Sequence, residues 1–224
     1  TLAKRFQRDA FRIATIGSDK PHGDIEYRAV RVAPGDIEHA IVNVLRYFEA
    51  NGAMIFCATR EAVRRLHASL VERGFSAVAL SGELSQSERS HALQALRDRR
   101  ARVCVATDVA ARGIDLPDLG LVIHAELPHD AETLQHRSGR TGRAGKKGIC
   151  ILLVPYPKRR RAEAMLRAAH VNAQWIAPPT IEEIRAGDQA RLLESIQAPE
   201  VAAEGGLVLA RQLVRRLTQE LGFS

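Results

Sequence analysis

The chain has 224 residues, of which 33 are basic and 26 acidic, and its formal net charge is +7 at pH 7. This length allows one sizeable core with an appendage, and the positive charge suits a polyanionic partner without identifying one. The cysteines Cys57, Cys104 and Cys150 lie in separate apolar runs without Cys-x-x-Cys spacing, which favours buried reduced thiols over a disulfide or zinc site. No run approaches about 18 apolar residues and no signal peptide is recognisable at the start, so we expect a cytoplasmic protein with no membrane partner.

Short apolar runs along the chain predict the strands of one parallel sheet. The first run alternates apolar and polar residues, whereas the run at 53–58 is continuously apolar between turn signals. A continuous run is typical of a strand that helices cover on both faces. The expected strands are residues 25–32, 53–58, 77–80, 103–107, 121–125 and 148–154. The sequence therefore predicts an α/β fold, with helices on both faces of a parallel sheet.

Amphipathic helices are expected between these strands. The helix that follows Pro34-Gly35-Asp36 keeps an apolar stripe at helical spacing and is expected to end at Asn51-Gly52. Thr59 and Asp130 can cap later helices, and Ser85-Gln86-Ser87-Glu88 forms a capping box. These caps place the helix starts directly after strands.

Charged residues gather after two of the expected strands. The first group is Asp108, Arg112 and Asp115, and the second is His136, Arg137, Arg140 and Arg143. Open α/β sheets bind ligands at the edge where their strands end. Guanidinium groups at every third residue through a glycine-punctuated turn can converge on one polyanion, such as a triphosphate or a nucleic-acid backbone.

Two stretches of this region carry a family resemblance. ATDVAARGID (residues 106–115) and HRSGRTGRAG (residues 136–145) resemble the fifth and sixth motifs of the C-terminal RecA-like domain of DEAD-box RNA helicases, which are ATPases that separate short RNA duplexes. Their order and their separation of about 20 residues make a more specific signal than a single glycine loop. The resemblance covers residues 1–157 and points to a bacterial member.

The resemblance implies a motor domain that works with an N-terminal RecA-like domain. The sequence contains neither a Gly-x-x-x-x-Gly-Lys-Ser/Thr loop nor an Asp-Glu-Ala-Asp string, so we expect it to carry half of an ATPase site. We expect ATP as cofactor, with Mg²⁺ held by the absent N-terminal domain, and RNA and that domain as partners. The full-length protein would be an ATP-dependent RNA helicase, and this chain alone is expected to be inactive.

The resemblance also implies roles at the nucleotide. Arg140 and Arg143 would reach the γ-phosphate as arginine fingers and, with His136, form the catalytic group. His136 would couple the γ-phosphate side of the site to RNA binding. Asp115 would accept a hydrogen bond from a ribose hydroxyl of ATP.

Further residues match RNA-binding and inter-domain positions of the family. Those implied to contact RNA are Thr59, Arg60, Gln86, Arg89 and Thr107. For Thr59 and Arg60, in the fourth-motif match IFCATR, a helix cap beside a solvated arginine explains the residues equally well.

The inter-domain group is Arg112, Arg137 and Asp108. Arg112 would bridge to the acidic box of the partner domain, Arg137 would hold neighbouring loops, and Asp108 would brace its own loop.

The C-terminal part of the sequence predicts helices outside the sheet. Thr180 and Glu183 form a second capping box, so a helix is expected over residues 181–196, and a last one follows Gly205-Gly206. The arrangement is similar to the dimerisation segment of the heat-resistant RNA-dependent ATPase of the same family. Packing on the parent domain is the alternative.

We therefore expect four parts. They are residues 1–20, an inter-domain linker or tail of the missing N-terminal domain; 21–157, the RecA-like helicase C-terminal domain; 158–177, a basic helix and extended linker packed on it; and 178–224, a helical extension that could dimerise. The favoured function is the second motor domain of an RNA helicase. The alternatives are a homodimerisation module of the same enzyme and a DNA helicase or translocase domain.

Overall fold

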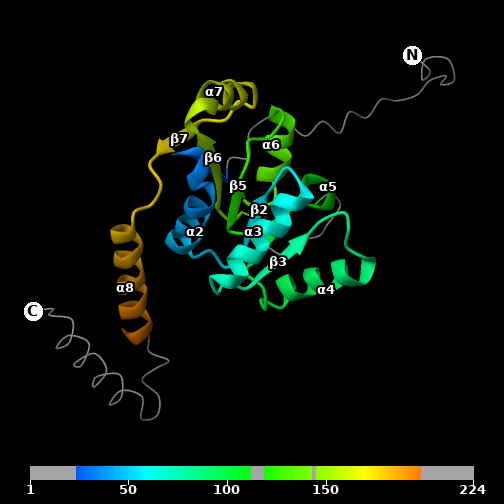
Figure 1. Cartoon of the computed structure of the whole chain (residues 1–224). Helices are drawn as coiled ribbons and strands as arrows, with labels where there is room; N and C mark the ends of the chain where they lie inside the picture. The colour runs from blue at the N-terminus through cyan, green and yellow to red at the C-terminus, as the bar shows by residue number, and fades with distance from the viewer. Residues whose placement is uncertain (1–23, 112–118, 143–144, 198–224) are drawn as a thin grey trace, which may run out of the picture.

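One parallel sheet organises the molecule. The computed structural model describes residues 24–111, 119–142 and 145–197 (Figure 1). Its described strands pair in parallel in the order β3-β4-β2-β5-β6-β1-β7. The strands are β1 (Ile25–Val32), β2 (Ala53–Phe56), β3 (Ala77–Leu80), β4 (Val103–Ala106), β5 (Leu121–His124), β6 (Gly148–Pro155) and β7 (Ala173–Ile176). The predicted α/β fold with a parallel sheet is confirmed.

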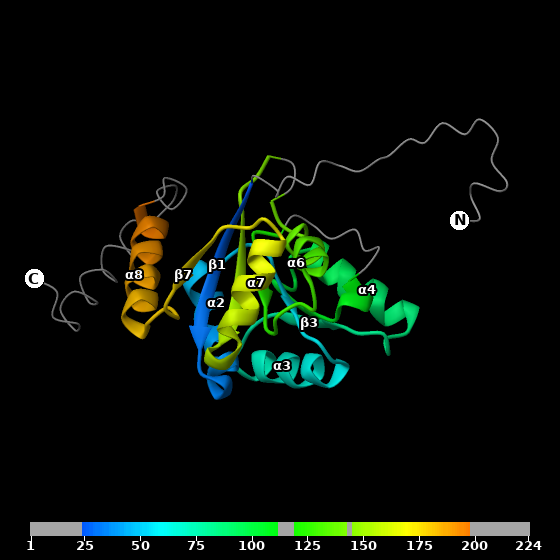
Figure 2. The same cartoon turned by 90° about the horizontal axis from the view of Figure 1, so that it is seen from above.

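Helices cover both faces of this sheet. They are α2 (Ile37–Phe48), α3 (Arg60–Glu72), α4 (Gln86–Arg97), α5 (Asp108–Ala111), α6 (Ala131–Ser138), α7 (Arg159–Ala168) and α8 (Ile181–Gln197), with 3₁₀ turns at Pro34–Asp36 and Tyr156–Lys158. Apolar residues of α2 and α3 pack on one face, and those of α4, α6 and α7 pack on the other. In two views α8 lies to one side of the sheet (Figures 1 and 2). Among the described residues, no helix has the length and apolar character needed to cross a membrane.

The central strands have two buried faces because helices lie on both sides of them. In β2, Met54 and Phe56 belong to the core under α4, α6 and α7, whereas Ala53 and Ile55 belong to the core under α2 and α3. Every residue of β2 is buried. This burial explains why the strand is a continuous apolar run in the sequence.

Four helices begin at the capping residues expected from the sequence. The caps are Thr59, Ser85, Asp130 and Thr180. At Ser85 the hydroxyl accepts from the backbone N–H of Glu88 at 3.3 Å, and the Glu88 carboxylate accepts from the Ser85 N–H at 2.8 Å. These bonds satisfy N–H groups that the first turn of a helix leaves without intrahelical partners.

The end of α2 differs from the prediction. The helix ends at Phe48 instead of continuing to Asn51-Gly52, and Glu49 takes the left-handed conformation with φ 41°. A non-glycine residue in this region costs about 1 kcal/mol. Arg102 offsets part of that cost, since its guanidinium donates to the carbonyl groups of Glu49 and Ala50 at 3.0 and 3.1 Å.

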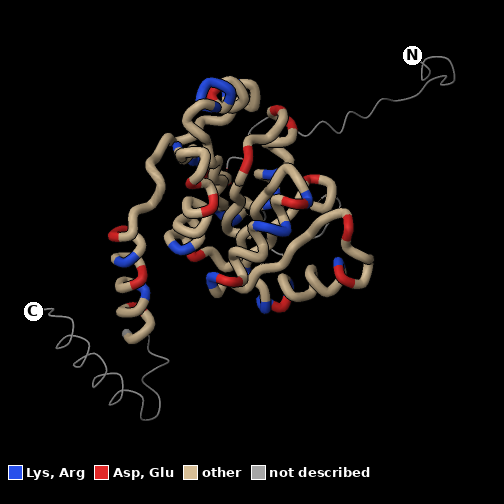
Figure 3. Tube along the Cα trace, viewed as in Figure 1, with Lys and Arg blue, Asp and Glu red and all other residues tan. Residues whose placement is uncertain are grey.

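The segment that follows α7 joins the sheet as an edge strand. It was expected to be extended, and as β7 it pairs in parallel with β1. The basic run that begins α7 is conspicuous in Figure 3. Within this run, the Arg159 guanidinium lies 5.4 Å from the centroid of the Trp175 ring and pairs with Glu163 at 2.8 Å. These contacts give Arg159 a packing role between α7 and β7.

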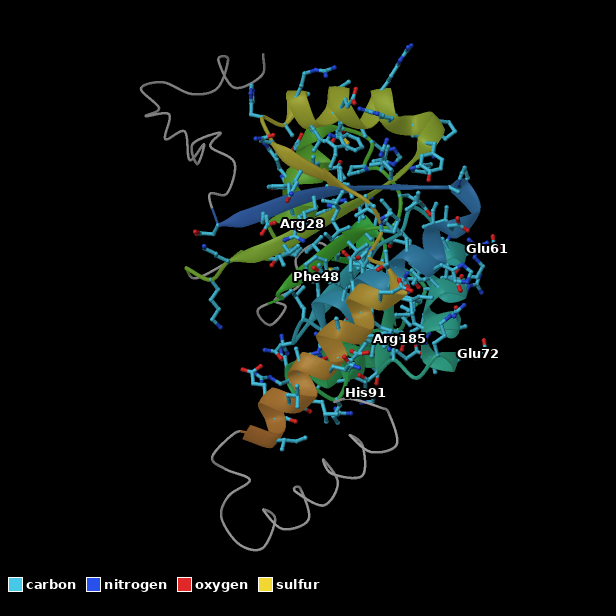
Figure 4. All side chains as sticks on the ribbon, turned by 90° about the vertical axis from the view of Figure 1, so that its left-hand side faces the viewer. Arg28, Phe48, Glu61, Glu72, His91 and Arg185 are labelled. Carbon is cyan, nitrogen blue, oxygen red and sulfur yellow. The ribbon has the colours of Figure 1, made fainter. Side chains whose placement is uncertain are left out.

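Helix α8 docks on the outside of α2. Figure 4 shows it running along the near side of the molecule. The side chain of Ile184 on α8 is buried. The Asn43 side chain on α2 donates to the carbonyl of Pro179 at 3.0 Å. The Arg46 guanidinium pairs with Asp188 at 3.0 Å. The docked part of the extension therefore packs on the parent domain.

Candidate functional site

A cleft of about 410 Å³ lies where β2 and β4 end. Its lining combines the loops after these strands with the whole length of α6. Five residues singled out from the sequence line this cleft: Thr107, Asp108, His136, Arg137 and Arg140. Side chains that lie well apart in the sequence thus come together at the edge of the sheet where ligands bind.

Arg137 is the structural centre of this cleft. Its side chain is only 3% exposed, and its Nε and Nη2 atoms donate to the two carboxylate oxygens of Asp108, both at 2.6 Å. Its Nη1 donates to the carbonyl of Glu126 at 3.2 Å, and the guanidinium lies 5.1 Å from the centroid of the Phe56 ring. A bidentate guanidinium–carboxylate pair fixes both distance and orientation. Arg137 therefore joins α6 to the last residue of β2 and to the segments that follow β4 and β5.

His136 and Arg140 belong to the polar lining of the cleft, which also includes His129, Asp130, Glu132 and Thr133. His136 is exposed on the last turn of α6, where its Nε2 lies 3.8 Å from a Glu132 carboxylate oxygen. Arg140 is half-buried just beyond the helix, and its backbone N–H donates to the carbonyl of Arg137 at 3.1 Å. A protonatable imidazole and a guanidinium that share one cleft can approach the same anionic group.

The turn after α6 depends on a glycine. Gly142 has φ +66°, and a Cβ at this position would lie 2.6 Å from Cγ1 of Ile25. The adjacent Thr141 is buried and donates its hydroxyl to the carbonyl of Leu119. This packing fixes the path of the chain next to Arg140. Of the other residues expected at the nucleotide or between domains, Arg112, Asp115 and Arg143 lie outside the described residues.

The remaining residues expected to contact RNA lie outside this cleft. Thr59 caps α3, where its hydroxyl accepts from the N–H of Ala62 at 3.1 Å, and Arg60 pairs with Glu83 at 3.1 Å. Gln86 is exposed at the first residue of α4.

Arg89 connects α4 to α5, and Thr107 lies between β4 and α5. The Arg89 guanidinium donates to the carbonyl of Ala110 at 2.8 Å, and Thr107 is buried to 8% exposure. Thr107 thus lines the cleft close to α5, the helix that Arg89 contacts from α4.

A buried polar chain beneath the cleft was not recognised from the sequence. His124 is completely buried, and its Nε2 lies 3.2 Å from Sγ of Cys150, which in turn lies 3.2 Å from Oγ of Ser138. Ser138 donates to the carbonyl of Leu134 at 2.7 Å. The chain therefore links β5 and β6 to α6 from below. Its only signal in the sequence is one histidine within an apolar run.

Burial sets the protonation states in this chain. Removal from water, followed by the nearby charge of Arg137, lowers the pKa of His124 well below its ordinary value of 6.5. Burial also raises the pKa of Cys150 to about 12. His124 is thus neutral, and its Nδ1 is a buried polar atom without a hydrogen-bond partner among the described residues.

Comparison with known proteins places the chain in a family. The family model described as "Helicase conserved C-terminal domain" matches residues 37–145. The solved structure of Escherichia coli DEAD-box protein SrmB bound to regulator of ribonuclease activity A is 34% identical, with a TM-score of 0.61, and the match covers 71% of this chain and 93% of that one. The chain belongs to the DEAD-box RNA helicase family. Its described domain is the helicase C-terminal domain of that family, as the two motifs predicted.

Other DEAD-box proteins agree with this assignment. The ATP-dependent RNA helicase DeaD of Mycobacterium tuberculosis is 31% identical over 219 residues, which are 98% of this chain and 38% of that protein. Saccharomyces cerevisiae Dbp5 bound to RNA and ADP BeF3 is 25% identical, with a TM-score of 0.66, and the match covers 75% of this chain and 45% of that one. The chain spans 30% to 38% of the length of several curated relatives that it matches.

The cleft suits part of the ATP site that the family implies. Asp108 is engaged by Arg137, so the cleft presents His136 and Arg140 to a ligand. Both can donate hydrogen bonds to phosphate oxygens. Among the described residues, no group of three or more His, Cys, Asp and Glu side chains could hold a metal ion.

Proposed function

We propose that this chain is the second motor domain of an ATP-dependent DEAD-box RNA helicase. It would hold RNA by its backbone and complete an ATP site held mainly by an N-terminal RecA-like domain. The observation that carries the proposal is the cleft at the ends of β2 and β4, in which Thr107, His136 and Arg140 meet. That cleft places an RNA-contact candidate beside two nucleotide-contact candidates.

Arg140 would act on the transferred phosphoryl group. When bound, ATP supplies the phosphoanhydride bond whose hydrolysis drives the cycle, with Mg²⁺ held by the N-terminal domain. The guanidinium groups of Arg140 and Arg143 would together neutralise charge that builds on the γ-phosphate. Asp115 would accept a hydrogen bond from a ribose hydroxyl of ATP. Arginine residues in this role are worth about 10³–10⁵ in rate.

Arg137 would act through position. Its paired guanidinium holds the base of α6 against Asp108, and thereby fixes where His136 and Arg140 lie. Arg112 is assigned to the contact with the acidic box of the N-terminal domain. His136 would pass the state of the phosphate site to the RNA side through Thr107, which shares its cleft.

RNA would be held through phosphates on the side of α4. Gln86 and Arg89 lie in the first turn of a helix of 12 residues, where backbone N–H groups and the helix dipole favour anions. Thr59 and Arg60 begin α3, which follows β2, two strands from β3 in the sheet order. A grip on the backbone predicts little sequence preference.

The test uses the full-length protein that we propose, in which an N-terminal RecA-like domain precedes this one. Arg140→Ala should lower the RNA-stimulated rate of ATP hydrolysis by about 10³-fold or more, with RNA affinity within about twofold of wild type. The matched control is Arg100→Ala, which removes a guanidinium that is paired with Asp98 outside the cleft. A normal rate in Arg140→Ala would contradict the proposal, and efficient unwinding of DNA but not RNA duplexes would favour the translocase alternative.

One observation favours dimerisation as a second function. Leu192 and Leu193 on α8 are 51% and 53% exposed, as expected of a face that another surface could cover. We propose that residues 178–224 contribute this contact, in the manner of the heat-resistant ATPase. Light scattering of the chain with and without these residues decides the matter, since a monomer at high concentration in both would end the idea.

The cellular setting and the division of the chain are part of the same proposal. We place the helicase in the cytoplasm, where its RNA substrates and ATP would be available. The boundaries at residues 20, 157 and 177 stay predictions, and limited proteolysis with mass spectrometry would locate them as sites of early cleavage.

A further inference from the structure

Helix α6 is anchored to the sheet mainly by polar side chains. Its buried residues are Leu134, Arg137 and Ser138, of which only the leucine is apolar. Apolar burial is non-directional, whereas a hydrogen bond restricts the angle as well as the distance between its partners. The two polar anchors therefore determine how α6 is rotated about its own axis. The proposed function assigns a role to Arg137 and none to Ser138.

The buried chain beneath α6 has one consistent direction of donation. The carbonyl of Leu134 can only accept, so the Ser138 hydroxyl uses its single proton in that bond at 2.7 Å. Ser138 must then accept from the thiol of Cys150, across 3.2 Å. The Cys150 sulfur in turn accepts from Nε2 of His124, also across 3.2 Å. Each proton of the chain thus has an acceptor.

This direction of donation agrees with the surroundings of His124. It assigns the neutral ring a proton on Nε2, and the atom without a partner among the described residues is then the lone pair of Nδ1. The ring is stacked on Phe56, whose own ring lies 5.1 Å from the Arg137 guanidinium. Because His124, Cys150 and Ser138 are all completely buried, water cannot replace their bonds. The buried chain and the Arg137 anchor therefore form one packed unit under α6.

Ser138 also adjoins the turn that carries Arg140. The Arg140 N–H donates to the carbonyl of Arg137 at 3.1 Å, and the Thr141 N–H donates to the carbonyl of Ser138 at 3.0 Å. These bonds tie the backbone around Arg140 to both polar anchors of α6. A rotation of the last turn of α6 would therefore move the Arg140 side chain.

We propose that Cys150 and Ser138 are positioning residues, which hold α6 at the angle at which Arg140 meets the γ-phosphate. The inference rests on the proposed function, in which Arg140 acts on ATP. Both residues are completely buried and neither lines the cleft, so they act through α6 and not by contact with the nucleotide. A misplacement of about 1 Å can lower a rate by about 10²-fold, so a small rotation is sufficient.

Steady-state ATP hydrolysis by the full-length protein with saturating RNA tests this role. Cys150→Ala removes the middle link of the chain and should lower kcat by about tenfold. KM for ATP should stay within about twofold of wild type, because the proposed function assigns ATP binding mainly to the N-terminal domain. Ser138→Ala breaks the same chain from the side of α6, where alanine favours the helix, and should have a similar effect. The test therefore stands even where Cys150→Ala does not fold.

Cys104→Ala is the matched control for Cys150→Ala. Both cysteines are completely buried in the same core cluster, and the Cys104 thiol forms no hydrogen bond with another described residue. The two variants lose the same atom and leave the same kind of cavity, so both should lower the unfolding temperature. Cys104→Ala should nevertheless keep kcat within about twofold of wild type.

Two further variants separate positioning from destabilisation. Cys150→Ser keeps a group that can accept from His124 and donate to Ser138, so it should restore most of the lost kcat. The double variant Cys150→Ala, Arg140→Ala should be no slower than Arg140→Ala alone, because a residue that acts only through Arg140 adds no loss once Arg140 is gone. Long-range ¹H–¹⁵N NMR of this chain should show the His124 proton on Nε2.

The outcomes distinguish this inference from the proposed function. Equal kcat values for Cys150→Ala and Cys104→Ala would overturn the inference and leave the proposed function standing. The same holds for a further loss in the double variant, for a lack of rescue by Cys150→Ser, and for a His124 proton on Nδ1. A normal rate in Arg140→Ala would instead overturn the proposed function, and the inference would fall with it.

Discussion

Arg137 shows how one side chain can be both buried and fully engaged. Its bidentate pair with Asp108 and its bond to the Glu126 carbonyl satisfy the guanidinium, and the ring of Phe56 covers one face. A buried charge is costly unless such partners surround it. Arg137 thus fixes the position of the end of α6, where His136 and Arg140 lie.

We predict that Arg137→Lys destabilises the fold by about 2–4 kcal/mol, because an ammonium cannot reproduce the fork that bonds Asp108 and Glu126 together. Urea denaturation followed by circular dichroism measures the loss. Arg28→Lys is the control, since Arg28 pairs with a half-exposed Glu26 and should change stability by less than about 1 kcal/mol. Similar losses in the two variants would show that Arg137 is an ordinary surface cation.

His124 makes stability depend on pH. Its pKa in the folded chain lies well below 6.5, so the unfolded chain binds a proton more readily. The resulting stability is fully present above about pH 6.5 and is lost as the pH falls from there toward the folded pKa. The buried Nδ1 without a described partner is consistent with this neutral form.

The predicted consequence is that wild type loses about 1.4 kcal/mol more than His124→Gln between pH 7.5 and pH 5.5, whatever the offset between the two proteins. Urea unfolding at the two pH values gives the difference. His39→Gln serves as control because it removes a histidine outside the buried chain. Parallel pH profiles for wild type and His124→Gln would mean that folding does not lower the pKa of His124.

At the scale of elements, α8 is held by few apolar contacts. Ile184 is 3% exposed under the helix, whereas Leu193 further along is 53% exposed. Polar contacts at Asn43 and Arg46 hold the same side of α2. The helix can therefore open without unfolding of the sheet, since local stability follows the apolar surface that an opening exposes to water.

We predict that Ile184→Ala loosens α8 selectively. Removal of a buried isoleucine side chain costs about 2–5 kcal/mol, which here falls mainly on the docking of residues 181–197. Hydrogen exchange measured by mass spectrometry should become faster in that segment and stay unchanged in β2 and β5. Leu193→Ala should leave exchange unchanged in a monomer, so equal acceleration in both variants would contradict this picture of the docked face.

The elements themselves were largely predictable from sequence. Capping residues such as Ser85 and Asp130 and the apolar run of β2 act locally, so their signals survive without tertiary information. The end of α2 was missed because Glu49 is held in its conformation by Arg102, a residue far along the chain. β7 was expected only as an extended segment, since its pairing with β1 is a non-local contact.

The candidate site was predictable where motifs carried it. The cleft at Thr107, Asp108, His136 and Arg140 was expected from motif order and from the rule that ligands bind where strands end. The chain from His124 to Cys150 and Ser138 was not, because it forms between β5, β6 and α6 only after folding.

At the scale of the whole molecule, the net charge and the sequence motifs bear on RNA binding and on ATP hydrolysis respectively. The net charge of +7 fits a polyanionic partner. In the proposed function, in contrast, the ATP site of this chain is only partial, because the sequence has no phosphate-binding loop of the Gly-x-x-x-x-Gly-Lys-Ser/Thr type. We therefore expect this chain to bind RNA without hydrolysing ATP.

We predict that the chain alone binds RNA but releases phosphate from ATP only at the background rate, with or without RNA. A guanidinium can stabilise developing charge only when the nucleotide is already positioned, and the proposed function assigns the positioning of phosphates and Mg²⁺ to the N-terminal RecA-like domain. A coupled phosphate-release assay measures the rate, and Arg140→Ala gives the level that contaminating ATPases contribute. Turnover in the wild-type chain that is well above background and disappears in Arg140→Ala would show that this chain contains a complete site.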